Sequence, residues 1–374
     1  MSKPKIIAFY LPQYHPTPDN DKWWGKGFTE WTNVGKAKPL FPGHYQPKVP
    51  ADLGYYDLRL PEVREAQAEL AKEAGIYGFC YYHYWFGNGK EELELPFNEV
   101  LRLGKPDFPF MLCWANESWH KKFWNNDGKG TSKEVLIEQI YPGEKDIIDH
   151  FYRLLPAFKD PRYIKIDGRI AFMIYKAHLY PELVKFINIW KSLAIKEGLP
   201  GFYFIAHKQS ENDFPNYNDI EILEQFKGNG IDALNVVRLY DAMPKRTFLR
   251  KAYNRITRTI FSLPKKYRYK NVMAKFITEY DKQDKIIPTI VPNWDHTPRS
   301  GTNGIVFEGS TPDLFKTHLD IALDSIKDKN TEDQILFLKS WNEWGEGNYI
   351  EPDLKYGHGY LDAIKSILNK KDYD

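Results

Sequence analysis

The sequence predicts an α/β protein folded as a (β/α)8 TIM barrel. Three observations carry this prediction. Short apolar runs recur eight times, amphipathic stretches separate several of them, and polar and aromatic residues gather where the runs end. A chain of 374 residues can form such a barrel around one core. We therefore expect a single domain over residues 1–374.

The eight runs have the length and the β-branched or aromatic content of buried strands. In chain order they are Lys5–Leu11, Ile76–Tyr82, Phe108–Trp114, Ile170–Tyr175, Phe202–Ala206, Ala233–Val237, Ile286–Val291 and Ile335–Leu338. A doubly wound sheet is the competing architecture, and it normally shows a glycine-rich phosphate turn after an early strand. Here the first run ends in Pro12-Gln-Tyr-His15 instead. The barrel is therefore favoured.

The stretches between the runs place apolar residues three and four positions apart, which is typical of helices that cover a sheet. They are Pro61–Ala74, Asp146–Phe158, Pro181–Glu197 and Asp313–Lys327, and a closing helix is expected at Leu361–Asn369. Pro61 and Pro181 stand where a proline is tolerated in the first helical turn.

Composition narrows the class of protein. A net charge of +2 gives no general attraction to nucleic acid, whereas aromatic residues make up 16% of the chain. Many aromatics stand among Asn, Glu and His, a mixture that suits a sugar. Cys80 and Cys113 lie inside apolar runs and are expected as buried free thiols. The apolar run at 6–11 is too short for a signal peptide, and no stretch reaches the ~18 residues of a membrane span, so we expect a cytoplasmic location.

Polar and aromatic residues follow most of the expected strands, and in a barrel these strand ends form the functional face. They include Gln13 and Tyr14, Tyr82 and Trp85, Lys176, Lys208, Asp295, and the segment 340–347, SWNEWGEG. From the strand ends we expect the following residues to line a substrate site: His15, His83, Tyr84, Trp114, Asn116, Glu117, His207, Asn293, Trp294 and Trp341.

Glu343 and Glu346 are the candidate catalytic residues. If helix or turn follows the last strand, residues three apart face the same side, so both carboxylates reach one pocket. Two close carboxylates raise the pKa of one of them, which supplies the acid and the charged group that glycoside cleavage needs. A helix cap or an ion pair with lysine is the structural alternative for either glutamate.

Glu117 is a rival because it follows Asn116, and an Asn-Glu pair closes the fourth strand in a large group of retaining barrel glycosidases. The expected strands place Glu117 on the third strand and Glu343 on the eighth, which does not match that group. Glu117 is therefore expected to accept a hydrogen bond from a sugar hydroxyl, or to support a neighbouring residue.

No metal or other cofactor is expected. His15, His83 and His207 end different strands without the spacing of a zinc motif, and hydrogen bonding to sugar is the better interpretation. The segment 19–21, Asp-Asn-Asp, has the form of the DxD motif of nucleotide-sugar enzymes, but no Rossmann-like context surrounds it.

Residues 238–275, after the sixth expected strand, form a basic helical insertion that holds twelve Lys or Arg and one acid, Asp241. Within it Phe248, Leu249, Ala252, Tyr253, Ile256 and Ile260 have helical apolar spacing. An ordinary outer helix is one interpretation. Peripheral contact with an anionic membrane, or with an acidic polysaccharide, is the other.

Four segments together carry a family resemblance: 9–16, FYLPQYHP; 23–34, WWGKGFTEWTNV; 113–119, CWANESW; and 340–347, SWNEWGEG. They resemble the WbsX family, over residues 5 to about 365. Proteins of this family are usually described as glycosyltransferases of bacterial surface-polysaccharide synthesis. They look related to glycoside hydrolase family 99, the endo-acting α-mannosidases and α-mannanases with (β/α)8 barrels.

Family 99 carries two glutamates in a Glu-Trp-His-Glu motif. The resemblance implies that Glu343 assists attack by the 2-hydroxyl of the substrate, giving a 1,2-anhydro sugar, and that Glu346 is the acid and then the base. Gly345 stands where family 99 has histidine. A retaining hydrolase or transglycosidase acting on a bacterial surface polysaccharide or its precursor is the expectation. A glycosyltransferase of lipopolysaccharide or capsule synthesis and a non-catalytic glycan-binding barrel are the alternatives.

Overall fold

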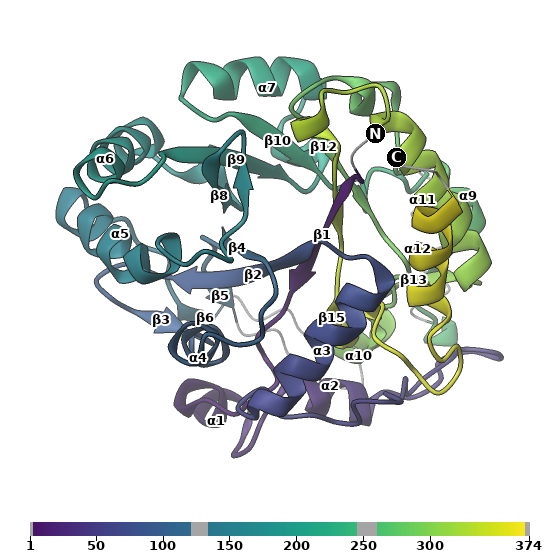
Figure 1. Ribbon diagram of the computed structural model, residues 1–374. Coiled ribbons are helices and arrows are strands. Elements are labelled where there is room, and N and C mark those ends of the chain that lie inside the picture. Colours follow the sequence, from purple (N-terminus) through teal and green to yellow (C-terminus); the bar gives the residue numbers. More distant parts are fainter. Residues whose placement is uncertain (1–2, 121–133, 245–259, 371–374) are drawn as a thin grey trace.

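The computed structural model describes residues 3–120, 134–244 and 260–370, and its centre is a closed parallel barrel (Figure 1). Its eight strands are β1 (Lys5–Tyr10), β2 (Gly78–Trp85), β4 (Phe110–Trp114), β8 (Arg169–Ile174), β9 (Phe202–Lys208), β10 (Ala233–Val236), β12 (Ile286–Ile290) and β14 (Ile335–Leu338). Each strand pairs in parallel with the next along the chain, and β14 pairs with β1, which closes the ring. The predicted (β/α)8 barrel and all eight predicted strands are confirmed.

Helices surround the strands, as Figure 1 shows. They are α1 (Pro18–Trp24), α2 (Glu30–Lys36), α3 (Pro61–Ala74), α4 (Leu95–Leu103), α5 (Glu144–Phe158), α6 (Leu183–Lys196), α7 (Asp219–Gly228), α9 (Tyr269–Met273), α10 (Thr297–Ser300), α11 (Pro312–Ile326) and α12 (Gly359–Lys370). Predicted helix 61–74 matches α3, which begins at Pro61 and ends before Gly75, a glycine with a φ of 88°. The other predicted helices match α5, α6, α11 and α12 within three residues.

Short strands decorate the barrel. They are β3 (Glu91–Glu92), β5 (Trp119–His120), β6 (Val135–Ile137), β7 (Lys165–Ile166), β11 (Lys265–Arg268), β13 (Ile305–Glu308), β15 (Asn342–Glu343) and β16 (Asn348–Tyr349). The pair β15 and β16 is antiparallel and encloses the 3₁₀ turn η6 (Trp344–Glu346). This hairpin presents the segment 340–347 at the carboxyl end of β14.

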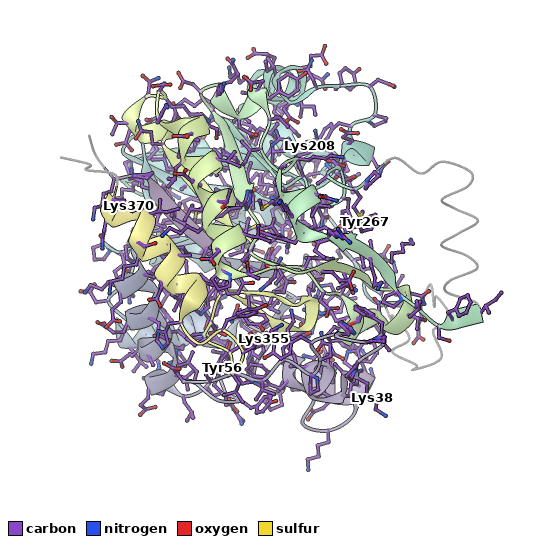
Figure 2. All side chains as sticks on the ribbon, turned by 90° about the vertical axis from the view of Figure 1, so that its right-hand side faces the viewer. Lys38, Tyr56, Lys208, Tyr267, Lys355 and Lys370 are labelled. Carbon is purple, nitrogen blue, oxygen red and sulfur yellow. The ribbon has the colours of Figure 1, made fainter. Side chains whose placement is uncertain are left out.

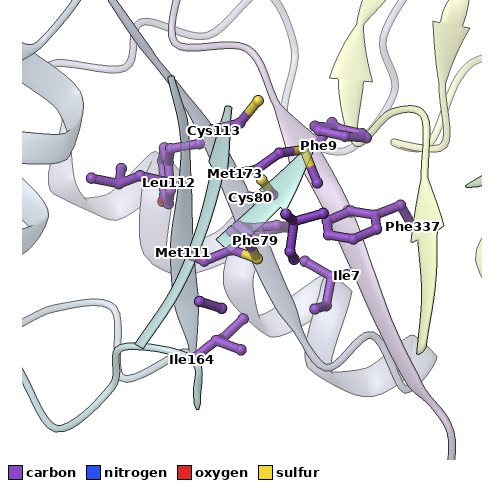
Figure 3. Close-up of a cluster of buried hydrophobic side chains, with 14 of the residues drawn as sticks. Ile7, Phe9, Phe79, Cys80, Met111, Leu112, Cys113, Ile164, Met173 and Phe337 are labelled. Carbon is purple, nitrogen blue, oxygen red and sulfur yellow. The ribbon is translucent and has the colours of Figure 1, made fainter. Parts of the chain in front are cut away.

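Apolar side chains from neighbouring strands fill the barrel core (Figure 3). Phe9 stacks on Phe337 with ring centroids 5.1 Å apart, which joins β1 to β14. Cys80 and Cys113 are buried free cysteines on the neighbouring strands β2 and β4, as predicted. Figure 2 shows the described side chains on the ribbon, seen from the side of α11 and α12.

The basic segment 238–275 follows β10, the sixth barrel strand, as predicted. Residues 245–259, which carry most of its expected apolar stripe, lie outside the described residues. Arg238 is no surface cation, because it is buried and pairs with Asp219 and with Asp281 at 2.6 Å. Within the ranges that the structure describes, no helix is both long and apolar enough to cross a membrane.

Candidate active site

The hairpin after β14 is fixed by its own polar side chains. The amide of Asn342 accepts a hydrogen bond from the Leu11 backbone at 2.8 Å and donates one to the Leu11 carbonyl at 3.0 Å, which ties the hairpin to the end of β1. The indole of Trp344 donates to Glu351 at 2.6 Å, and its ring stacks on Tyr349 with centroids 3.6 Å apart. Asn342 and Trp344 therefore anchor the hairpin, and their side chains face away from Glu343 and Glu346.

Glu343 and Glu346 face a common guanidinium. Arg299 of α10 places Nη1 2.5 Å from Glu346 Oε1 and 3.3 Å from Glu343 Oε1. Because both oxygens lie close to one nitrogen, at 2.5 Å and 3.3 Å, they are at most about 5.8 Å apart. The structure therefore brings the two predicted catalytic residues together.

The two carboxyls differ electrostatically. Burial and the charge of Glu346 raise the pKa of Glu343, against the nearby cations Lys339 and Arg299. Burial also acts to raise the pKa of Glu346, but Arg299 and then His296 hold it well below its usual value. Glu343 therefore holds a proton more readily than Glu346, and acid–base chemistry at a glycosidic bond uses such a difference.

These carboxyls lie in a cavity of about 410 Å³ at the carboxyl ends of the barrel strands. Much of its wall is aromatic, with polar side chains such as Gln209 among the rings: Trp24, Phe28, Tyr82, Tyr84, Trp119, Tyr175, Tyr240 and Trp294. Lys339 is buried beside them, with Nζ 3.5 Å from Glu343 Oε2 and 3.3 Å from the Tyr82 hydroxyl. Aromatic faces with hydrogen-bonding groups between them can hold a sugar ring.

Five of the predicted site residues line this cavity. Tyr84, Glu117 and Trp294 are in its wall, together with Glu343 and Glu346. The Glu117 carboxylate lies 3.9 Å from Lys176 Nζ and its side chain is about half exposed. Asn293 lines a smaller cavity of about 100 Å³, of which Trp294 is also a wall.

Three predicted lining residues turn away from the main cavity into the core around the barrel. His83 Nε2 lies 2.8 Å from His150 Nε2 of α5, and burial lowers the pKa of His83 to about 3. The indole of Trp114 donates to the Trp85 carbonyl, and Trp341 is fully buried against Phe79. Side chains alternate between the two faces of a strand, so His83 and Trp114 point away from the cavity, and Trp341, which follows β14, is buried beside Phe79.

Three more predicted residues lie beside or beneath the cavity wall. Asn116 braces the loop after β4, since its amide accepts from the Lys176 backbone at 2.7 Å. His207 is buried beneath Tyr175, stacked at 4.5 Å, with Nδ1 2.7 Å from Asn235 Oδ1. His15 is buried and, like Asn116 and His207, does not line the cavity. Among the residues that the structure describes, no three His, Cys, Asp or Glu side chains are placed to hold a metal ion.

The sequence reasoning missed three charged residues of the site: Glu30, Arg299 and Lys339. Glu30 lies in the segment 23–34 that carries the family resemblance, so that segment was the available signal. Lys339 directly precedes the segment 340–347. Arg299 stands in a four-residue helix with no periodic pattern to mark it.

The (β/α)8 barrel and the paired carboxyls in its aromatic cavity are those of a carbohydrate-active enzyme. Residues 6–364 match the family described as "Glycosyltransferase WbsX". The chain belongs to this family, as its sequence resemblance indicated.

Two curated relatives, both described as "Uncharacterized protein WxcX", come from Xanthomonas campestris pv. campestris. The relative from strain ATCC 33913 is 34% identical over 371 residues, and the one from strain B100 is 34% identical over 368 residues. Each alignment covers 98% of this chain but 50% of the relative, so the chain spans about half the length of these proteins.

Solved structures share the fold. A "glycoside hydrolase-like protein" aligns with a TM-score of 0.58 at 15% identity, over 98% of this chain and 94% of its own. The GH99 endo-α-mannosidase from Bacteroides thetaiotaomicron, in complex with bis-tris-propane, aligns with a TM-score of 0.56 at 14% identity, over 98% and 96%. Similarity at this identity establishes the barrel fold.

Proposed function

We propose that the chain cleaves or transfers α-mannoside-like glycosidic bonds of a bacterial surface polysaccharide, or of its precursor, with retention of configuration. The observation that carries this proposal is the placement of Glu343 and Glu346 on one nitrogen of Arg299, inside an aromatic-lined cavity. One carboxyl must protonate the leaving oxygen while the other assists attack at the anomeric carbon.

Retention requires two displacements at the anomeric carbon. The first is made either by a carboxylate of the chain or by the 2-hydroxyl of the sugar, and the family resemblance favours the hydroxyl. A water molecule or an acceptor sugar makes the second displacement, so the same pair of carboxyls serves hydrolysis and transfer. Lys339 would hold its charge beside Glu343 through both steps, because the carboxylates around it raise its pKa against burial.

A second candidate function is transfer from a nucleotide sugar, which the description of the matching family favours.

One assay distinguishes the two candidates. The purified chain is incubated with α-linked mannan oligosaccharides and with surface polysaccharide fragments, each with and without nucleotide sugars. Mass spectrometry then reads the product lengths. Shortening or redistribution of chains without a nucleotide sugar supports our proposal. Elongation that depends on a nucleotide sugar establishes the second candidate. Binding with neither product contradicts both.

We also propose that the protein is cytoplasmic and contacts the inner membrane through the segment 238–275. Ile260 and Phe261 are 68% and 64% exposed at the start of the described part after residue 259, and three cations that follow in the sequence, Arg268, Lys270 and Lys275, are also exposed. Exposed apolar side chains among cations suit an anionic surface. Co-sedimentation with phosphatidylglycerol vesicles at low salt is expected, and absence of binding contradicts it.

A further inference from the structure

Gly345, between the two glutamates, leaves room for a third carboxylate. A Cβ atom built on Gly345 would lie 1.6 Å from Glu30 Oε1 and 2.7 Å from Glu30 Cδ, whereas real Cβ contacts essentially never fall under 3.0 Å. The carboxylate of Glu30 therefore occupies the space that any side chain at position 345 would need. Only glycine at 345 is compatible with Glu30 in this place.

Glu30 is buried at the first residue of α2, with 1% of its surface exposed. Its Oε1 accepts hydrogen bonds from Arg299 Nε at 2.8 Å and from the Asn33 amide at 3.4 Å. A buried carboxylate is costly unless it is paired, and Arg299 supplies the paired charge. Glu30 in turn holds the Nε edge of the guanidinium, so that Nη1 points to the catalytic pair.

Arg299 lies closer to one of the two proposed catalytic carboxyls than to the other. Its Nη1 is 0.8 Å closer to Glu346 than to Glu343, at 2.5 Å against 3.3 Å. His296, from the same loop, lies 3.3 Å from Glu346 Oε1, whereas Lys339 lies 3.5 Å from Glu343 Oε2. Short charge-assisted hydrogen bonds favour the ionised form of the group that accepts them.

Three tyrosines and Glu30 also lie around Glu343 and Glu346. Tyr82 and Tyr84 of β2 and Tyr240 after β10 lie beside the two carboxyls, and burial raises the pKa of all three, so these phenols are neutral. Glu30 adds a negative charge on the far side of Arg299. Arg299 and His296 depress the pKa of Glu346 against burial, whereas burial and the charge of Glu346 elevate the pKa of Glu343.

We propose that Glu30 and Arg299, in the space left by Gly345, form a positioning unit that keeps Glu346 ionised and assigns the shared proton to Glu343 before substrate binds. Its catalytic consequence rests on the proposed function: Glu343 starts as the acid and Glu346 as the base. This order is the reverse of the one that the family resemblance implies for the two glutamates.

The test follows both carboxyls without any substrate, so its outcome is independent of the proposed function. The chain is labelled with ¹³C at the glutamate side-chain carboxyl and titrated by NMR, with Glu343→Gln and Glu346→Gln used to assign the two signals. Glu346 is expected to titrate below Glu343. Arg299→Met is expected to raise the midpoint of Glu346 by about 1–3 pH units. Arg299→Lys keeps the charge without the fork and restores part of the difference.

Arg102→Met, which removes an exposed arginine paired with Glu99, is the matched control and leaves both midpoints unchanged. A wild-type midpoint of Glu346 above that of Glu343 overturns the proposal. So does a folded Arg299→Met variant, with native methyl signals, in which Glu346 titrates as in the wild type.

A double-mutant cycle tests the steric part. Gly345→Ala is expected to lower Tm in the wild type, because the new methyl group and the Glu30 carboxylate compete for one space. In a Glu30→Ala background the carboxylate is gone, so the same change lowers Tm less. Equal losses of Tm in the two backgrounds overturn the assignment of this space to Glu30.

Discussion

Glu351 is the buried carboxyl that holds the hairpin carrying Glu343 and Glu346, and its replacement by glutamine gives a pH-dependent prediction. Its oxygens accept hydrogen bonds from the Trp344 indole at 2.6 Å, the Gln67 amide at 2.7 Å and the Tyr56 hydroxyl at 2.9 Å. Burial nevertheless raises the pKa of Glu351 from 4.5 to about 7, against the lowering by these donors. Ionising Glu351 in the folded protein is therefore unfavourable.

The magnitude follows from this pKa. A gap of about 2.5 pH units, at 1.36 kcal/mol per unit, corresponds to about 3 kcal/mol in total. Because the folded pKa lies above the unfolded one, the unfolded state loses its proton first as pH rises. The contribution of Glu351 to stability is therefore fully present below about pH 4.5 and is lost as the pH passes about 7, with roughly 2.5 kcal/mol of the loss between pH 5 and pH 8.

Urea denaturation of the wild type and of Glu351→Gln at pH 5 and pH 8 measures this effect. Glutamine keeps the size of the side chain and does not titrate. We expect the stability of the wild type relative to the variant to fall by roughly 2.5 kcal/mol between the two pH values. A difference between the two proteins that does not change with pH would refute the reasoning, because Glu351 would then have an ordinary pKa in the fold.

Three further predictions concern the cavity and its support. Lys339→Met is expected to lower kcat by about 10²-fold or more with a smaller change in KM, because the ammonium lies 3.5 Å from Glu343; steady-state kinetics with an unchanged kcat would contradict it. Trp119→Ala is expected to weaken glycan binding about tenfold in calorimetry, and Trp119→Phe to restore part of it, since the indole lines the cavity. Asn293→Ala removes two hydrogen bonds of 3.2 Å to the Tyr349 backbone and is expected to cost about 1–3 kcal/mol in urea denaturation, with no loss contradicting this role.

The barrel could be predicted because its strands are continuous apolar runs, buried on both faces by helices and core. Short helices were harder to predict from the sequence. The helix α10 has four residues and α2 has seven, and neither is long enough to display a clear period. These two helices carry Arg299 and Glu30, and the pairing of residues 269 positions apart has no local signal.

The lining at the end of β2 follows the alternation of side chains along the strand. At the end of β2, Tyr82 and Tyr84 line the cavity, whereas His83 between them contacts α5. Alternation along the strand separates these residues, but the prediction included His83 together with its neighbour Tyr84 and left Tyr82 out. Glu343 and Glu346 were found because the short turn between them returns both to the same side.

The most direct test of the account compares the two glutamates in one assay. With the glycan that the product screen identifies, kcat is measured for the wild type, Glu343→Gln, Glu346→Gln and the control Glu69→Gln on the exposed face of α3. We predict that each catalytic-site variant loses about 10²–10⁴-fold in kcat while the control matches the wild type. Wild-type activity in a folded Glu343→Gln or Glu346→Gln variant would contradict the central claim that both carboxyls carry out the reaction.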